Sequence, residues 1–190
     1  AGCRGPRRLR RAVARVITFL TDFGLQDDFV GTCHGVMKRI APEVEIIDIT
    51  HGIAPQAVLQ GALTLANTLP FMPEGVHLAV VDPGVGGARR ALALRDGHGR
   101  IYVGPDNGLL IPAAEKLGGI AEAHELANPE YALESVSRTF HGRDLFSPAA
   151  AHLALGVTLA DMLRLQAQAK QAEAARRSGG VPGSHHRRPR

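Results

Sequence analysis

Three side chains of this sequence have types and spacing that could perform acid–base chemistry. Asp82 ends the apolar stretch VHLAVVD and opens the turn Pro83–Gly87, whose glycines permit positive φ and close backbone approach to a ligand. Arg89 follows seven residues later and could fold back to pair with Asp82, which would keep the carboxylate ionised and oriented. His141, within the segment TFHGRD, could act as a general base or orient another group. The alternative is that Asp144 caps a helix and His141 is an ordinary loop residue.

Polar residues also follow the ends of the predicted strands along the chain. These groups are Thr21-Asp22, Thr50-His51, Asp82 and Asp106-Asn107. In open α/β sheets, ligands bind at the carboxyl edge of the strands. A single residue of this kind would most simply cap the following helix. Four groups in register, with glycines between them, favour a binding site at that edge.

The elements that must position these residues alternate between strand and helix patterns. Strands are predicted at 15–23, 44–50, 76–82, 91–95, 100–103 and 120–126. Helices are predicted at 28–40, 57–69, 108–117 and 142–155. Asp96-Gly-His-Gly predicts a tight hairpin between 91–95 and 100–103. The order of elements predicts an α/β fold, a mainly parallel sheet flanked by helices.

Charge divides the chain into regions that composition alone conceals. The net charge is +4, but residues 1–15 hold six arginines and residues 170–190 hold six basic residues, so 16–169 carries ten basic and seventeen acidic residues. We therefore predict a basic tail at 1–15, an α/β catalytic domain at 16–156, a helical extension at 157–177 and a disordered basic tail at 178–190.

Composition argues against several classes of function. The basic tails lack interleaved aromatic residues, so nucleic-acid binding is not expected. Apolar runs are too short for a membrane span, and we expect neither a secretory signal nor a membrane partner. Two cysteines, Cys3 and Cys33, are too few for a disulfide framework or a cysteine-based zinc site, which favours the cytoplasm.

Five ordered motifs give the sequence a specific resemblance. They are Thr21-Asp22-Phe23-Gly24, Asp48-Ile-Thr50-His51, Val81-Asp82-Pro83-Gly84-Val85-Gly86 with Arg89, Pro105-Asp106-Asn107-Gly108-Leu109, and Thr139-Phe140-His141-Gly142-Arg143-Asp144. In this order and spacing the chain resembles the S-adenosyl-L-methionine (SAM) hydrolase family, also called SAM hydroxide adenosyltransferases. That family is related to the SAM-dependent fluorinase and chlorinase. The resemblance covers about residues 16–156.

The resemblance implies roles for particular residues. A water-activating set of Asp, Arg and His falls on Asp82, Arg89 and His141, and the ribose-binding aspartate falls on Asp22. Thr21, Phe23 and Asn107, in the same motifs, are expected to contact the substrate. The resemblance also implies a homotrimer in which SAM lies between one subunit's N-terminal domain and the next subunit's C-terminal β-domain.

The implied reaction is hydrolysis of SAM to adenosine and L-methionine by in-line attack of water on C5′. Methionine leaves as a neutral thioether, so the reaction needs no acid and we expect no cofactor. The Asp and His spacings form no recognised ligand set, and no metal site is predicted. The family's second domain should begin near residue 165, and no strands are predicted beyond that point, so we expect this β-domain to be missing and the chain to be inactive alone.

Three other functions remain open on the sequence. A SAM-dependent halogenase would use a halide in place of water, but a halide needs no base, and the short connection 88–104 leaves no space for the extra loop of the fluorinase. A non-catalytic nucleoside-binding fragment would bind adenosine without turnover. A metal-dependent phosphohydrolase using Asp22, Asp82 and His141 ranks last, and a chelator would inactivate it.

Overall fold

The computed structural model describes Ala14 and residues 16–163. The strands are β1 (Val16–Thr21), β2 (Glu45–Thr50), β3 (Val76–Val80), β4 (Ala91–Asp96), β5 (Ile101–Pro105) and β6 (Ile120–Glu125). The α-helices are α1 (Phe29–Ile40), α2 (Val58–Thr68), α3 (Ile111–Lys116) and α4 (Ser147–Ala154). Short helical turns are η1 (Leu69–Phe71), η2 (Pro129–Tyr131), the π-helical η3 (Gly142–Phe146) and η4 (Leu159–Leu163).

The strands of the described region form one sheet in the order β2-β1-β3-β5-β4-β6. β1 pairs in parallel with β2 and β3, and β3 pairs in parallel with β5. β4 runs antiparallel to both of its neighbours, β5 and β6. The predicted α/β fold with a mainly parallel sheet is confirmed. The predicted hairpin is also present, closed by a hydrogen bond of 3.0 Å from the Asp96 amide to the Arg100 carbonyl.

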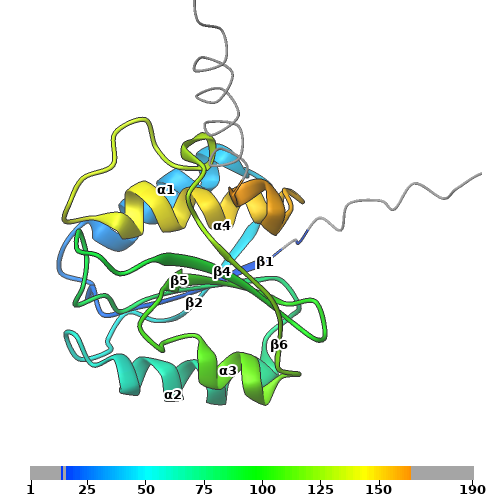
Figure 1. The fold of residues 1–190 in the computed structure, drawn as a ribbon. Coiled ribbons are helices and arrows are strands. Elements are labelled where there is room, and N and C mark those ends of the chain that lie inside the picture. Colours follow the sequence, from blue (N-terminus) through cyan, green and yellow to red (C-terminus); the bar gives the residue numbers. More distant parts are fainter. Residues whose placement is uncertain (1–13, 15, 164–190) are drawn as a thin grey trace, which may run out of the picture.

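Helices cover both faces of the sheet, so that its central strands are buried (Figure 1). All six residues of β1 and all five of β3 are buried. One core lies between the sheet and helices α1 and α4, and a second lies between the sheet and helices α2 and α3. Near-continuous burial explains why β1 and β3 read as apolar runs instead of alternating patterns.

Packing continues past residue 156, where the sequence placed the end of the α/β unit. Leu159 and Met162 of η4 are buried, and the amides of Ala127 and Asn128 donate to the Met162 carbonyl at 3.2 and 2.8 Å. Of the predicted flanking segments, residues 164–190 and all of 1–15 except Ala14 lie outside the described residues. None of the helices in the described part of the chain has the length and apolar character needed to cross a bilayer.

Candidate active site

A pocket lies at the carboxyl edge of the parallel strands. It is lined by Asp22, Phe23, Val80, Asp82, Val85, Thr139, Phe140, His141 and Gly142. Asp22 directly follows β1 and Asp82 follows β3 by two residues, and these strands are parallel neighbours. The prediction that both carboxylates lie at one edge of the sheet is therefore confirmed.

Arg89 reaches this edge because β4 runs in the opposite direction and begins there. Its Nε lies 3.0 and 2.9 Å from the two carboxylate oxygens of Asp82, and its Nη2 lies 2.5 Å from Oδ2. The side chains are only 11% and 5% exposed, so the pair is shielded from water. Such a charge-assisted fork fixes the orientation of the carboxylate.

The turn after β3 is held against the loop that carries His141. Gly86 has φ of 71°, and a Cβ there would lie 2.0 Å from the carbonyl oxygen of Arg138. Gly142 likewise packs on Phe23, where a Cβ would meet the ring at 2.7 Å. Glycines at these two points therefore allow the loop that carries His141 to approach both the turn after β3 and the Phe23 ring closely.

His141 connects to the ion pair through Arg89. Arg89 Nη2 donates to His141 Nδ1 at 2.7 Å. Because a guanidinium has no acceptor, Nδ1 must be unprotonated, and the neutral ring then carries its proton on Nε2. Burial, followed by the charge of Arg89, lowers the pKa of His141 below its ordinary value. Both effects favour a neutral His141 with a fixed tautomer.

Asp22 and Phe23 form the wall of the pocket beside this group. Asp22 Oδ2 accepts a hydrogen bond of 2.8 Å from the Gln56 amide, which orients the carboxylate. Gln56 has φ of 65°, an uncommon conformation for a residue other than glycine. The Phe23 ring packs edge-to-face against Phe29 and Phe140, with centroids 5.9 and 5.7 Å apart. The pocket therefore combines acidic side chains with an aromatic wall.

A family model described as the SAM hydroxide adenosyltransferase N-terminal domain matches residues 17–163 of this chain. The match covers most of the chain and all the pocket residues. The chain belongs to this family.

Relatives and solved structures agree with this family assignment. The chain is 57% identical over 145 residues to the (R)-S-adenosyl-L-methionine hydrolase of Salinispora arenicola, covering 76% of this chain and 55% of the relative. It is 32% identical over 167 residues to the fluorinase of Nocardia brasiliensis, covering 76% and 55%. A crystal structure of an uncharacterised Thermotoga maritima protein matches with a TM-score of 0.71 and 44% identity, covering 75% and 55%. The chain thus spans about half the length of these proteins.

Two further residues that the motifs single out in this domain do not line the pocket. Thr21 is buried, and its Oγ1 lies 2.9 Å from His51 Nδ1 and accepts from the Phe23 amide at 3.1 Å. Asn107 donates to the Val81 carbonyl at 2.8 Å and accepts from the Leu109 amide at 3.2 Å. In this structure both side chains fix the backbone of the loops that carry Phe23 and Asp82.

The sequence motifs did not identify several groups that shape this pocket. Phe140 was noted only as part of a motif, yet it forms part of the aromatic wall. Asp144 is fully buried, where it accepts from Arg143 Nε at 2.5 Å and from the Ser137 amide at 2.8 Å, and so anchors the loop before His141. The sequence signal that could have identified Phe140 was its position next to the candidate catalytic residue His141. His34, which lies outside the pocket, was also not singled out, since it comes from a helix without a motif.

Proposed function

We propose that this chain is the N-terminal part of an enzyme that hydrolyses SAM to adenosine and L-methionine. The observation that carries the proposal is the contiguous arrangement of Asp82, Arg89 and His141 at a pocket that also contains Asp22. The names of the most similar relatives support the same reaction. Because the chain spans only about half of their length, the activity belongs to the complete protein.

The proposed step is an in-line displacement at C5′ of the adenosyl group. A C5′–O bond forms to water while the C5′–S bond breaks, and its electron pair neutralises the sulfonium as methionine leaves. The leaving group takes no proton, so neither a general acid nor a cofactor takes part. The water loses one proton. Asp82 is suited to accept this proton. Arg89 can only donate hydrogen bonds, and the one acceptor nitrogen of neutral His141, Nδ1, is already occupied by Arg89.

In this proposal His141 and Arg89 orient the nucleophile and the base. The Nε2–H of His141 donates to the water oxygen and holds a lone pair toward C5′. Arg89 fixes both Asp82 and the ring of His141 from one guanidinium. Positioning of this kind supplies much of the rate of a displacement reaction whose leaving group is already good.

Asp22 is the proposed ribose-binding residue, since one carboxylate can accept hydrogen bonds from both ribose hydroxyls. Phe23 contacts the substrate directly through the pocket wall. Thr21 and Asn107 support substrate binding through the loops that they fix. The remaining contacts to adenine and methionine come from the second domain of the complete protein.

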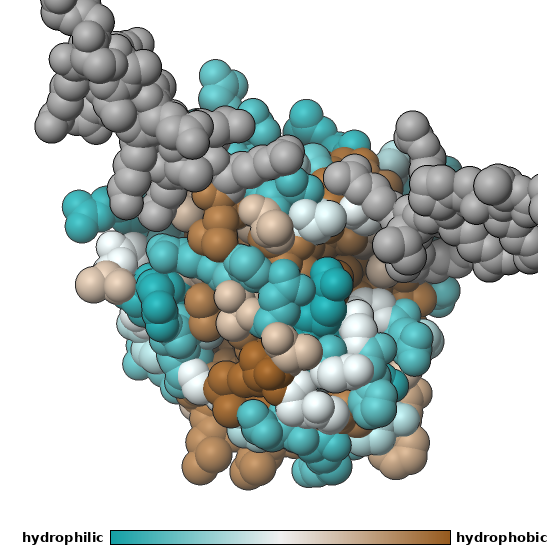
Figure 2. Space-filling view, turned by 45° about the vertical axis from the view of Figure 1, so that its right-hand side comes forward, coloured by the Kyte–Doolittle hydropathy of each residue, from teal (hydrophilic) through white to brown (hydrophobic). Residues whose placement is uncertain are grey.

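We also propose that the complete protein is a cytoplasmic homotrimer, because SAM is an intracellular metabolite and because apolar groups remain exposed on this domain. Leu59, Leu63 and Phe71 are 71%, 52% and 85% exposed on α2 and η1. Figure 2 shows hydrophobic surface in the lower part of the view, where the layer of α2 and α3 lies in Figure 1. Light scattering coupled to gel filtration tests this state, and a monomeric complete enzyme would contradict it.

The activity is tested in a hybrid in which residues up to 163 are joined to the C-terminal part of the Salinispora arenicola relative. Both sulfonium epimers of SAM are supplied, since the relative's name specifies the (R) form. We expect adenosine and methionine, with ¹⁸O from labelled water in the 5′-hydroxyl. The relative itself is the positive control.

Three results would contradict hydrolysis. Halogenated adenosine formed in chloride or fluoride would show a halogenase. Adenosine binding by calorimetry without any turnover in the hybrid would show a nucleoside-binding protein. Adenosine without ¹⁸O would exclude water as the nucleophile.

A further inference from the structure

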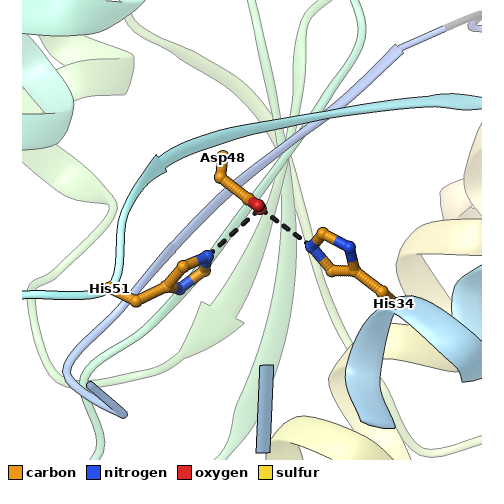
Figure 3. A group of neighbouring side chains, drawn as sticks. All are labelled: His34, Asp48 and His51. Atoms are coloured by element: carbon orange, nitrogen blue, oxygen red, sulfur yellow. Dashed lines mark hydrogen bonds and ion pairs between the residues drawn. The ribbon is translucent and has the colours of Figure 1, made fainter. Parts of the chain in front are cut away.

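Two histidines and one aspartate meet outside the active-site pocket. His34 comes from α1, Asp48 from β2, and His51 from the residue after the end of β2 (Figure 3). One nitrogen of each histidine and one oxygen of Asp48 all lie within 4.8 Å of one another. None of the three lines the pocket.

Both imidazoles are directed at the same carboxylate oxygen (Figure 3). His34 Nε2 lies 2.9 Å and His51 Nε2 lies 3.1 Å from Asp48 Oδ1. Ligands of a Zn²⁺ ion lie about 2.0–2.2 Å from the metal, so neighbouring ligand atoms are about 3.3 Å apart in a tetrahedral site. A small outward movement of the partly exposed His34 and Asp48 side chains opens that space.

The Nε2 atom of His51 is an independent sign that a ligand belongs here. It is buried without a hydrogen-bond partner of acceptable geometry, although Asp48 Oδ1 is near, and the side chain is only 3% exposed. A buried nitrogen whose one polar neighbour is poorly aligned is incompletely satisfied, and this carries a free-energy penalty. A metal ion between His51 Nε2 and Asp48 Oδ1 would satisfy both atoms.

The other ring nitrogen of His51 already has a hydrogen-bond partner, as the second nitrogen of a metal-binding histidine usually does. His51 Nδ1 lies 2.9 Å from Thr21 Oγ1, and the Phe19 ring packs edge-to-face on the imidazole at 4.9 Å. These contacts fix the ring with Nε2 directed at Asp48. The ring is thus oriented before any ion arrives.

The chemistry of the three ligands selects the kind of ion. Imidazole nitrogens suit zinc and neighbouring first-row metals, whereas Ca²⁺ and Mg²⁺ prefer sites made only of oxygen. The side chains of His34 and Asp48 are 32% and 40% exposed, which gives an ion access and leaves room for a water ligand.

We propose that His34 Nε2, Asp48 Oδ1 and His51 Nε2 bind one divalent ion of the Zn²⁺ class. The ion secures the end of β2 to α1 and to the loop after β1. Two contacts extend from His51 to that loop, namely its bond to Thr21 and a 2.8 Å hydrogen bond from the Gly24 amide to its carbonyl. The ion supports the segment that carries Asp22 without touching the substrate pocket.

The test is titration of the untagged full chain with Co²⁺, followed by displacement with Zn²⁺. His185 and His186, adjacent residues outside the described part, are replaced by glutamine in every protein so that they cannot bind metal. We expect one Co²⁺ per chain with visible absorption bands typical of four-coordinate cobalt, which disappear on addition of Zn²⁺. Absence of saturable binding would overturn the proposal and leave the cluster as a hydrogen-bonded network.

Variants assign the ion to these residues. His34→Gln and Asp48→Asn alter partly exposed side chains, and each should weaken Zn²⁺ binding by at least the roughly 10–100-fold seen when an outer-shell partner is lost. The matched control is His124→Gln, because His124 also pairs with a carboxylate, that of Glu122 at 2.8 Å, away from the cluster. Equal binding by all three variants would overturn the assignment. Circular dichroism confirms that each variant is folded.

Discussion

At the scale of single residues, the contact between Arg89 and His141 determines what the histidine can do. A guanidinium only donates, so the 2.7 Å contact assigns the lone pair of Nδ1 to Arg89 and the proton to Nε2. The sequence left two roles open for His141, a general base or an orienting group. The geometry favours the orienting role, and in the proposed mechanism Asp82 is the proton acceptor.

We predict that His141→Ala slows SAM hydrolysis in the hybrid enzyme by roughly 10²–10⁴-fold. Adenosine affinity should stay unchanged, because His141 is assigned to the water and not to the nucleoside. The double variant His141→Ala, Arg89→Ala should be little slower than the slower single variant, since residues that act as one unit are non-additive. Single-turnover rates measure the slowing in the single variants and in the double variant, and calorimetric titration measures the adenosine affinity. Hydrolysis by His141→Ala at the parental rate would refute the proposed role.

For Asp22 we predict a defect in binding. Asp22→Ala removes a charged acceptor and should weaken adenosine affinity by roughly 1.5–3 kcal/mol, with a smaller effect on the chemical step. Asp22→Asn is the matched control, because its side-chain oxygen can still accept from the Gln56 amide that bonds Asp22 at 2.8 Å. Calorimetric titration with adenosine measures the difference. Parental affinity in Asp22→Ala would show that the ribose is bound elsewhere.

At the scale of elements, the pocket depends on the direction of β4 and on the loops that meet above the sheet. An antiparallel β4 starts at the edge where β1 and β3 end, which brings Arg89 to Asp82. The loop before η3 then approaches the turn after β3 through Gly86 and Arg138. π-Helical turns are frequent at functional sites, and η3 begins at the residue after His141.

Gly86→Ala should impair the enzyme by separating these two loops. Its Cβ would lie 2.0 Å from the Arg138 carbonyl oxygen, in addition to the cost of positive φ, which is roughly 1–2 kcal/mol. Gly99→Ala is the control, because Gly99 also has positive φ, 92°, but nothing lies within 4 Å of its Cβ position. We expect both variants to lose stability and only Gly86→Ala to lose activity when assayed below its unfolding temperature. Similar activities in the two variants would contradict this role.

At the scale of the whole molecule, the pH dependence of the free energy of unfolding includes a contribution from one histidine buried in the sheet. His77 of β3 is fully buried, with Nδ1 2.9 Å from Thr18 Oγ1. Burial, and secondarily the charge of Arg100, lowers its pKa from 6.5 to about 4, whereas nearby Asp96 acts in the opposite direction. The folded protein therefore accepts a proton on His77 less readily than the unfolded chain does.

This difference predicts loss of stability in acid. The stabilisation is fully present above pH 6.5 and is lost as the pH falls toward 4, because the unfolded state then binds the extra proton. Between pH 7.5 and 4.5 the contribution of His77 should be about 2–3 kcal/mol. Urea unfolding at both pH values measures it in the parent, in His77→Gln and in the exposed control His98→Gln. The decrease in the free energy of unfolding between these pH values should be smaller in His77→Gln than in the parent and in His98→Gln. An equal decrease in all three proteins would exclude His77 as its source.

Much of the fold and half of the site could be predicted from the sequence, because both depend on local patterns. Continuous apolar runs such as 16–21 and 76–80 indicate buried strands, and their alternation with helices indicates a parallel sheet. Parallel strands end at one edge, so the positions of Asp22 and Asp82 at two strand ends are enough to place them together, as the pocket confirms. The same patterns do not indicate whether a polar side chain at a strand end points into the pocket or bonds to the protein backbone. Thr21 and Asn107 were therefore expected to contact the substrate, whereas in the structure they bond to neighbouring protein groups.

Only the tertiary structure decided which atoms meet across distant segments. Hydrogen bonds to Arg89 set the tautomer of His141, and packing of α1 on the sheet brings His34 to Asp48 and His51. Neither result has a local signature, because each depends on the rotation of a helix or the crossing of loops separated by many residues. The sequence by itself determined the secondary structure, the sheet edge and the chemical types available there. The pairing of those groups required the three-dimensional packing, which alone sets distances of a few ångströms.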